Sequence, residues 1–244
     1  MASLFEAQEV QEEINLPAKE LPVHHHHKND FRESFHWRIF RIMAEFVEGF
    51  QFLADYKKTV SFFGSTKFDE RNEHYQEALE LARLLAEDGF TVITGGGPGI
   101  MEAANRGAAE VSKDHQSVGI NIELDIAQRK NPYVQRSAAF HYFFTRKVML
   151  SASAQAYVFF PGGFGTLDEM TEMITLVQTG KIPKNVPIIL FGKAYWQPFL
   201  DWVNMTMCQK YRYVEKEEVA IIQLVDTVED AVKIIRKTSE RKYG

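Results

Sequence analysis

The stretch Ala156-Tyr157-Val158-Phe159-Phe160 runs directly into Pro161-Gly162-Gly163-Phe164-Gly165-Thr166-Leu167-Asp168-Glu169. The first five residues are all apolar and predict a buried strand. After the glycines, apolar residues recur every three to four positions as far as Val177, which predicts a helix. A strand that enters a helix through a glycine-rich turn presents free backbone N–H groups at the positive end of the helix dipole. Such a turn is a ready site for phosphate.

The same alternation of strands and helices extends over most of the chain. Strands are expected at 59–63, 90–94, 117–122, 140–144, 156–160, 187–191 and 219–225, and helices at 78–85, 100–111, 145–154, 167–180, 196–209 and 228–236. The polar segment 125–137 is expected to be a loop over the active face. Continuous apolar strands between amphipathic helices predict an α/β fold with a parallel sheet that is covered on both faces.

The chain before the first strand has two different parts. Residues 1–29 are polar and are interpreted as a mobile tail. The tail includes His24 to His27, a run that fits a solvated tail or a tag remnant better than a metal site, because no other ligand lies nearby in sequence. Residues 30–56 have an apolar and aromatic helical pattern. This N-terminal helix is expected either to pack on the domain at 57–244 or to lie at a subunit interface.

The overall composition limits the kind of protein. With 244 residues, 45% of them apolar, the chain is long enough to bury the core of one domain. A net charge of −5 argues against a general binder of nucleic acid or membrane surfaces. The single Cys208 excludes an internal disulfide and suits a reducing compartment. No apolar run approaches the ~20 residues that span a bilayer, so we expect a cytoplasmic protein without a membrane partner.

Four features fall at the carboxyl ends of predicted strands, where ligands bind in open parallel sheets. They are Gly64-Ser65, the Gly95–Gly99 turn, the Arg146-Lys147 pair and the Gly162–Thr166 turn. The second turn, Gly95-Gly96-Gly97-Pro98-Gly99, is not the dinucleotide fingerprint, because its sixth position is Ile100. A simple tight turn is the alternative to an anion site there.

Thr166 and Glu169 have two interpretations. Their spacing is that of a capping box, in which the threonine bonds a backbone N–H and the glutamate reaches back. Glu172 lies one turn further on, and two carboxylates beside an anion site destabilise it unless a cation or a substrate compensates. Arg146 and Lys147 are cations at the start of a helix, where the dipole disfavours them. Together these placements favour a functional site.

The motif Pro161-Gly162-Gly163-Phe164-Gly165-Thr166-Leu167-Asp168-Glu169 resembles the P-G-G-x-G-T-x-x-E motif of the Lonely Guy (LOG) family. Arg146-Lys147 and Thr94-Gly95-Gly96-Gly97 match other signatures of that family, and the resemblance extends from about Thr59 to Arg236. It implies a Rossmann-like, doubly wound parallel sheet with helices on both faces, here with an added N-terminal helix. It also implies hydrolysis of the N-glycosidic bond of nucleoside 5′-monophosphates, namely cytokinin ribotides or AMP, to free base and ribose 5-phosphate.

The resemblance also implies roles for individual residues. Catalysis would rest on Arg146 and Glu169. The substrate and its phosphate would be bound by Ser65, Gly95, Gly96, Gly97, Lys147, Gly162, Gly163, Gly165, Thr166 and Glu172. Neither a metal nor a cofactor is expected. The family's site is completed near the interface of a homodimer or larger homo-oligomer, so a second copy is the expected protein partner.

Two other functions are compatible with these motifs. One is a nucleotide-binding or sensing protein without turnover. The other is a dinucleotide-dependent oxidoreductase that uses Glu123 at a strand end as its ribose-binding acid, although the broken glycine fingerprint argues against it. The preferred base and the proton donor to the leaving base are not decided by the sequence.

Overall fold

The computed structural model of this protein describes residues 35–111, 115–123 and 130–240. The chain divides into two units, residues 1–38 and 39–244, and the sheet lies entirely in the second. The predicted tail at 1–29 and the histidine run lie outside the described residues, and so do 124–129 of the predicted loop. Within the described residues, no helix has the length and apolar character needed to cross a membrane.

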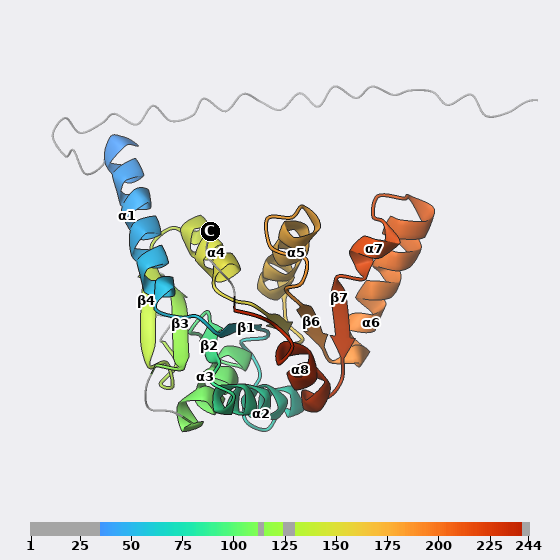
Figure 1. Cartoon of the computed structure of the whole chain (residues 1–244), viewed down its shortest axis with the longest axis horizontal. Helices are drawn as coiled ribbons and strands as arrows, with labels where there is room; N and C mark the ends of the chain where they lie inside the picture. Colours follow the sequence, from blue (N-terminus) through green and yellow to red (C-terminus); the bar gives the residue numbers. More distant parts are fainter. Residues whose placement is uncertain (1–34, 112–114, 124–129, 241–244) are drawn as a thin grey trace, which may run out of the picture. The chain divides into compact units, whose positions relative to one another are not determined.

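Parallel strands and helices alternate along the chain (Figure 1). The strands are β1 Thr59–Phe63, β2 Thr91–Thr94, β3 Ser117–Ile122, β4 Arg136–Phe140, β5 Tyr157–Phe159, β6 Ile188–Phe191 and β7 Ile222–Val225. The helices are α1 Phe35–Ala54, α2 Glu73–Glu87, α3 Ile100–Val111, α4 Phe143–Ala152, α5 Phe164–Gln178, α6 Lys193–Trp202, the π-helix η2 Val203–Lys210, α7 Lys216–Val219 and α8 Val228–Ile235.

The strands form one sheet in the order β4-β3-β2-β1-β5-β6-β7, and every neighbouring pair is parallel. The chain builds outward from β1 to β4, returns to the other side of β1 with β5, and then continues to β7. This is the doubly wound, Rossmann-like arrangement, in which ligands bind where the strand order reverses. The predicted α/β fold is confirmed, and the reversal point lies between β1 and β5.

Two hydrophobic clusters cover the two faces of the sheet. One contains buried side chains of α2, α3 and α8, and the other contains those of α1, α4, α5 and α6. In β1, Phe62 belongs to the first cluster and Phe63 to the second, because successive side chains of a strand point to opposite faces. Phe62 stacks on Phe160 at 6.3 Å and Phe63 on Phe159 at 4.8 Å between ring centroids. Both faces of the β1–β5 pair are therefore fixed by aromatic contacts beneath the reversal point.

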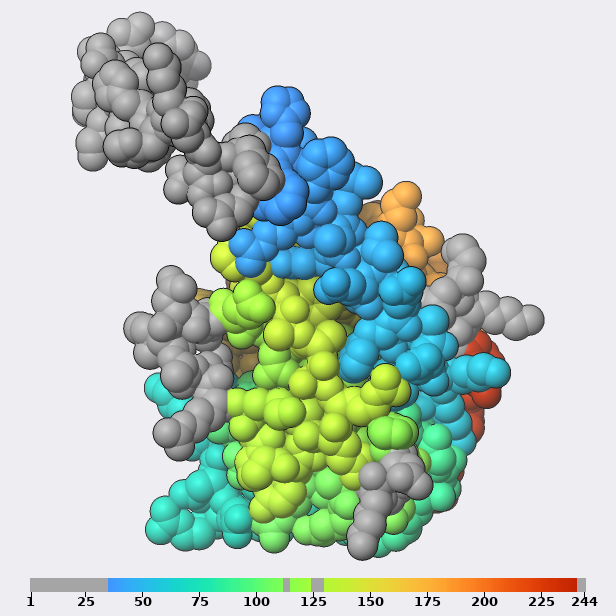
Figure 2. All heavy atoms as spheres, turned by 90° about the vertical axis from the view of Figure 1, so that its left-hand side faces the viewer, coloured from blue at the N-terminus to red at the C-terminus, as the bar shows by residue number. Residues whose placement is uncertain are grey.

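Helix α1 packs on the sheet unit through a narrow stripe. Its buried residues are Glu45, Gly49 and Leu53, and a side chain at Gly49 would collide with Met149 and crowd Phe140. Figure 2 shows this helix, in blue, on the surface beside the yellow-green segment that contains β4 and α4. From Ile39 onward, the helix belongs to the same compact unit as the sheet. Intrachain packing, one of the two expected placements, is therefore present, although most of the apolar side chains of α1 remain exposed.

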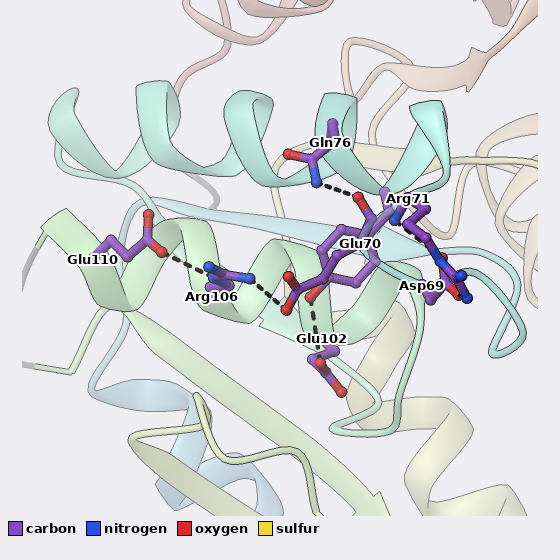
Figure 3. A network of polar contacts seen from close by, with 8 residues as sticks. Asp69, Glu70, Arg71, Gln76, Glu102, Arg106 and Glu110 are labelled. Atoms are coloured by element: carbon purple, nitrogen blue, oxygen red, sulfur yellow. Dashed lines mark hydrogen bonds and ion pairs between the residues drawn. The ribbon is translucent and has the colours of Figure 1, made fainter.

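A polar network ties the loop after β1 to α3 (Figure 3). Arg106 on α3 pairs with Glu110 on the same helix at 2.9 Å and with Glu70 of the β1–α2 loop at 2.8 Å. Gln76 donates to the Glu70 carbonyl at 2.6 Å, and Arg71 pairs with Asp69 at 2.8 Å. These contacts hold the end of the loop that begins with Gly64-Ser65 at the edge of the sheet.

Three predicted elements differ most from the structure. The strand expected at 140–144 is β4 at Arg136–Phe140, and α4 begins at Phe143. Because β4 is an edge strand with partly exposed residues, it lacks the apolar run that marks the central strands. The helix expected at 196–209 is α6 followed by the π-helix η2, and the strand expected at 219–225 begins at Ile222 after the short helix α7.

Candidate active site

A cavity of about 490 Å³ opens at the carboxyl ends of β1, β2, β3 and β5. Its walls come from the loops that follow these strands and from the first turns of α3, α4 and α5. The lining residues are Phe63, Gly64, Ser65, Thr66, Lys67, Gly95, Gly96, Gly97, Met101, Asn121, Ile122, Phe143, Arg146, Leu150, Gly163, Gly165, Thr166 and Glu169. The predicted convergence of the glycine turns with Arg146 and Glu169 is therefore present in one cavity.

The amino end of α5 forms one wall of this cavity. Gly163 is the N-cap residue and has no side chain to cap the helix, and the first helical hydrogen bond runs from the Leu167 N–H to the Gly163 carbonyl at 3.1 Å. The N–H groups of Phe164, Gly165 and Thr166 therefore have no helical acceptor. Free N–H groups at the positive end of a helix dipole bind anions.

The capping-box interpretation of Thr166 and Glu169 is wrong. It requires Thr166 to be the N-cap, but the N-cap is Gly163, three residues earlier, and α5 begins at Phe164. Thr166 and Glu169 instead lie in the first two turns, where both are buried, with 7% and 6% of their surface exposed. Gly163, Gly165 and Thr166 line the cavity as predicted.

Gly162 does not line the cavity, and its predicted role in binding phosphate remains a prediction. A side chain at Gly162 would collide with that of Thr166 and come within 3.1 Å of the Gly64 backbone. The Pro161 carbonyl accepts a hydrogen bond from the Ser65 N–H at 2.9 Å. Gly162 therefore permits close packing between the turn after β5 and the turn after β1.

The Gly95–Gly97 turn is held by a buried polar network. Gly96 has a φ of +72°, which favours glycine, and its N–H donates to the Thr94 hydroxyl at 2.9 Å. The backbone N–H of Asn131 donates to the Gly96 carbonyl and its side-chain amide to the Gly97 carbonyl, both at 2.9 Å. Asn105 joins Thr94 and Asn131 from below, at 2.6 and 3.0 Å. The three glycines line the cavity on a rigid support.

Arg146 lies between the turn after β2 and the end of β3. Its Nε donates to the Ile120 carbonyl at 2.8 Å, and a side chain at Gly95 would collide with its guanidinium. Burial lowers the pKa of Arg146, although the charge of Glu169 acts in the opposite direction. An arginine in a protein remains protonated. Arg146 is thus a permanent, partly desolvated cation in the cavity wall.

Helix α4, which carries Arg146, is positioned by a carboxylate from α1. Glu45 is 8% exposed and accepts hydrogen bonds from the N–H groups of His141 at 3.0 Å and Tyr142 at 3.3 Å. Its carboxylate also accepts from the Thr145 hydroxyl at 2.5 Å. Because no side chain of its own caps α4, Glu45 takes that place at the positive end of the helix.

Glu169 is the buried acid of the cavity. Its Oε2 has no hydrogen-bond partner, and no ion pair joins its carboxylate to any described residue. Burial raises its pKa from 4.5 to about 7, against the opposing charges of Lys147 and Arg146. A buried carboxylate without a partner destabilises a protein. Such an arrangement in a cavity is typical of a functional acid.

Lys147 and Glu172 do not line the cavity, so their predicted roles in binding the substrate remain predictions. Lys147 pairs with Asp168 at 2.7 Å and with Glu172 at 3.2 Å, on the side where α4 meets α5. Burial alone would lower the pKa of Lys147, but these carboxylates and Glu169 raise it above its usual value. Helical periodicity explains the difference, because neighbours in sequence face different directions on a helix.

Ser65 lines the cavity as predicted, and its loop contributes two residues that the sequence analysis missed. The Ser65 hydroxyl accepts from the Lys67 N–H at 3.1 Å, and Thr66 and Lys67 both line the cavity. Met101, Asn121 and Phe143 were missed as well. Asn121 has a sequence signal, since it is a polar residue at the carboxyl end of an apolar strand. The others follow only from the packing of α3 and α4.

Other candidates are not part of this cavity. Glu123, the acid of the oxidoreductase alternative, does not line it, and its carboxylate lies 3.6 Å from His141. Among residues 35–111, 115–123 and 130–240, no three His, Cys, Asp or Glu side chains are grouped so that they could hold a metal ion. The chemistry available in the cavity therefore consists of an anion-binding helix end, an arginine, a lysine and one buried carboxylate.

Relatives of the chain share its fold and, in part, its sequence. The cytokinin riboside 5′-monophosphate phosphoribohydrolase LOG of Oryza sativa is 28% identical over 158 residues, which are 64% of each chain. A bifunctional cytokinin biosynthesis protein of Fusarium pseudograminearum is 24% identical over 73% of this chain. The matches span 64% of the rice protein and 40% of the fungal one, so this chain covers less than two thirds of either relative.

One solved structure shares the fold of this chain, and one family model matches more than half of its sequence. The solved structure of the molybdenum cofactor binding protein of Rippkaea orientalis matches with a TM-score of 0.54 and 18% sequence identity. The match covers 74% of this chain and 96% of that protein, and at this identity it shows the fold alone. A family described as "Possible lysine decarboxylase" matches residues 101–235, more than half of the 244 residues. The matched segment contains Arg146 and the whole Pro161–Glu169 motif on which the resemblance rested. The chain belongs to this family, the LOG family.

Proposed function

We propose that this protein hydrolyses the N-glycosidic bond of nucleoside 5′-monophosphates, cytokinin ribotides or AMP, to free base and ribose 5-phosphate. The observation that carries the proposal is the Glu169 carboxylate, buried and without a partner in a cavity that also contains Arg146 and the amino end of α5. The substrate named for the rice relative, a cytokinin riboside 5′-monophosphate, is of the same chemical class. An acid, a cation and an anion site in one cavity suit cleavage of the bond between a phosphorylated ribose and its base.

The phosphate would bind at the amino end of α5. Three N–H groups there lack a helical acceptor, and Gly163 and Gly165 leave the backbone open, with no atom near the position of a side chain. Lys67, on the neighbouring loop, lines the same cavity and forms no ion pair within the described residues. A dianionic phosphate placed there would receive backbone N–H bonds and a positive charge.

Glu169 would act on the sugar. Departure of the base leaves positive charge on the ribose, as in glycoside hydrolysis. An ionised Glu169 stabilises this charge and accepts a proton from the water that attacks C1′. The C1′–N bond breaks, its electron pair stays on the base, and the proton lost by water replaces the sugar on that nitrogen. Arg146 holds the sugar oxygens, and its charge lowers the pKa of the neighbouring Glu169 carboxylate against the larger effect of burial.

The direct test is to incubate the protein with AMP and with isopentenyladenosine monophosphate and to measure the free base. Release of base and ribose 5-phosphate in equal amounts supports the proposal. A protein that produces no base from any monophosphate, yet is stabilised against heat by these ligands, is instead a nucleotide-binding protein without turnover. Glu169→Gln provides the matched negative control for the activity measurement.

We further propose that the protein works in the cytoplasm as a homodimer or larger homo-oligomer with the site near the interface. Phe164 at the start of α5 is 91% exposed and Phe143 at the start of α4 is 53% exposed, both beside the cavity. Large apolar side chains gathered around a functional site are typical of an interface. Light scattering would measure the assembled mass, and a monomeric mass at active concentrations would contradict this proposal.

A further inference from the structure

The two ends of the cavity differ in chemistry. The end at β1 and β5 contains the Ser65 and Thr66 hydroxyls, Lys67 and the amino end of α5. The end at β2 and β3 is formed by the apolar side chains of Met101, Ile122 and Phe143, by the amide of Asn121 and by the backbone of the Gly95–Gly97 turn. Arg146, bonded to the Ile120 carbonyl, lies toward this second end. The cavity is therefore built for an elongated ligand with an anionic end and a flat, mainly apolar end.

The Asn121 side chain is the single amide of the apolar end, and it makes no hydrogen bond to any described group. Its Oδ1 is buried. The amide lies against the Gly96 backbone, where an added side chain would come within 2.5 Å of Nδ2 and 2.6 Å of Oδ1. A buried amide oxygen without a hydrogen-bond donor destabilises the folded protein, and an apolar residue of the same size would avoid this loss. The arrangement is explained if a ligand supplies the missing partners.

The position of Asn121 matches that of a base rather than that of a phosphate. In the sheet order, β3 is separated from β5 by β2 and β1. With strands ~4.8 Å apart, the ends of β3 and β5 are separated by about 14 Å. Asn121 is therefore far from the anion-binding end of α5, while Arg146 and Glu169 line the same cavity. A nucleotide bound by its phosphate at α5 would extend its base toward Asn121.

We propose that Asn121 is the residue that reads the hydrogen-bonding edge of the base, with Phe143 and Met101 contacting its faces. This inference rests on the proposed function, because the phosphate at α5 sets the direction of the ligand. A carboxamide offers one acceptor and one donor side by side, which matches the amino group and N7 of adenine. Aromatic rings bind the faces of all bases, so Phe143 would add affinity, and the amide would add discrimination.

The first test measures binding without turnover. In the Glu169→Gln background, Asn121→Leu should weaken AMP binding by about 10- to 100-fold, as expected for a lost bidentate contact. Ribose 5-phosphate, which lacks the base, should bind within about twofold of its original affinity, since the phosphate site is unchanged. Asn204→Leu, on η2 and outside the cavity, is the matched control and should alter neither affinity.

The second test measures specificity in the active protein. Asn121→Asp keeps an acceptor for the adenine amino group but removes the donor. It should therefore lower kcat/KM for inosine monophosphate more than for AMP, because hypoxanthine presents an acceptor where adenine presents a donor. Thermal unfolding within a few degrees of the parent protein shows that each variant is folded.

The outcomes separate this inference from the proposed function. If Asn121→Leu weakens the binding of AMP and of ribose 5-phosphate equally, or weakens neither, Asn121 does not contact the base, even where the protein is active. An unchanged ratio between the adenine and hypoxanthine substrates in Asn121→Asp would overturn it as well. If the wild-type protein releases base from no monophosphate, the proposed function itself fails, and the inference fails with it.

Discussion

Glutamine in place of Glu169 removes a negative charge and keeps the size of the side chain. The carboxylate is 6% exposed, and its Oε2 has no hydrogen-bond partner. Glu169→Gln is therefore expected to increase the stability of the protein and to lower its activity strongly. Opposite effects of one substitution on stability and on turnover are typical of a functional residue held in an unfavourable environment.

The magnitude follows from the pKa of Glu169. Burial raises this pKa from 4.5 to about 7 in the folded protein, so the folded state binds the proton more tightly than the unfolded state does. The free energy of unfolding therefore decreases as the pH rises from about 4.5 to about 7 and stays low above that range. At 1.36 kcal/mol per pH unit, the loss at pH 8 is ~3 kcal/mol, and glutamine would avoid it.

Urea unfolding at pH 8 and at pH 5 measures this effect. Glu169→Gln should exceed the wild type by ~3 kcal/mol at pH 8 and by less than ~1 kcal/mol at pH 5, where the wild-type carboxyl is protonated in the folded state. Turnover of AMP by the variant should fall by ~10² or more, because glutamine neither accepts a proton nor stabilises positive charge.

The matched control is Glu172→Gln. Glu172 lies one turn further along α5, outside the cavity, and its carboxylate pairs with Lys147 at 3.2 Å. Removal of this paired charge should not increase stability, and it should leave most of the activity. If Glu169→Gln is no more stable than the wild type at pH 8, the buried carboxylate does not destabilise the protein. If the variant retains its turnover, Glu169 is not the acid of the reaction.

Three other predictions use the same geometry. The kcat/KM for AMP should rise with pH and level off above about 7, as Glu169 ionises. Lys147→Met should shift the midpoint of this pH profile to higher pH, because the charge of Lys147 lowers the pKa of Glu169 in the wild type. Lys67→Met should raise KM for monophosphates by about 10-fold with a smaller change in kcat, which is the loss expected for one charge-assisted contact to phosphate. Kinetic constants equal to those of the wild type would exclude Lys67 from phosphate binding. Glu45→Ala should lower stability by ~1 kcal/mol or more and reduce kcat as well, since the start of α4 loses its cap; full activity at reduced stability would show that Arg146 is positioned without Glu45.

The central strands and the glycine turns were predictable because their signals are local. Residues 59–63 and the helix at 100–111 have the predicted boundaries, since continuous apolar runs and helical spacing reflect burial directly. The edge strand β4 was predicted four residues too late, because it pairs with a neighbour on one side alone and has partly exposed residues. Its sequence, Arg-Ser-Ala-Ala-Phe, lacks the apolar run of a central strand.

The candidate site was predicted in outline and corrected in detail. The sequence placed Arg146 and Glu169 at the same edge of the sheet, and both line the cavity. It could not distinguish Arg146 from Lys147, or Glu169 from Glu172, as lining residues, because small rotations about a helix axis decide which side chain faces the cavity. The capping box failed for a similar reason, since the true helix start depends on the packing of Gly162 against Thr166 and Gly64.

The sequence by itself determined the fold class and the glycine-rich turns, because each is encoded in a continuous stretch whose composition and period specify one local structure. The resemblance to the LOG family motif singled out Glu169 as the acid of the proposed reaction. Only the tertiary structure decided that the buried Glu169 has a carboxylate oxygen without a hydrogen-bond partner, that Glu45 caps the helix of Arg146, and that Asn121 lines the cavity. These properties depend on contacts between segments distant in sequence, which meet because the parallel sheet brings the carboxyl ends of separate strands to one edge.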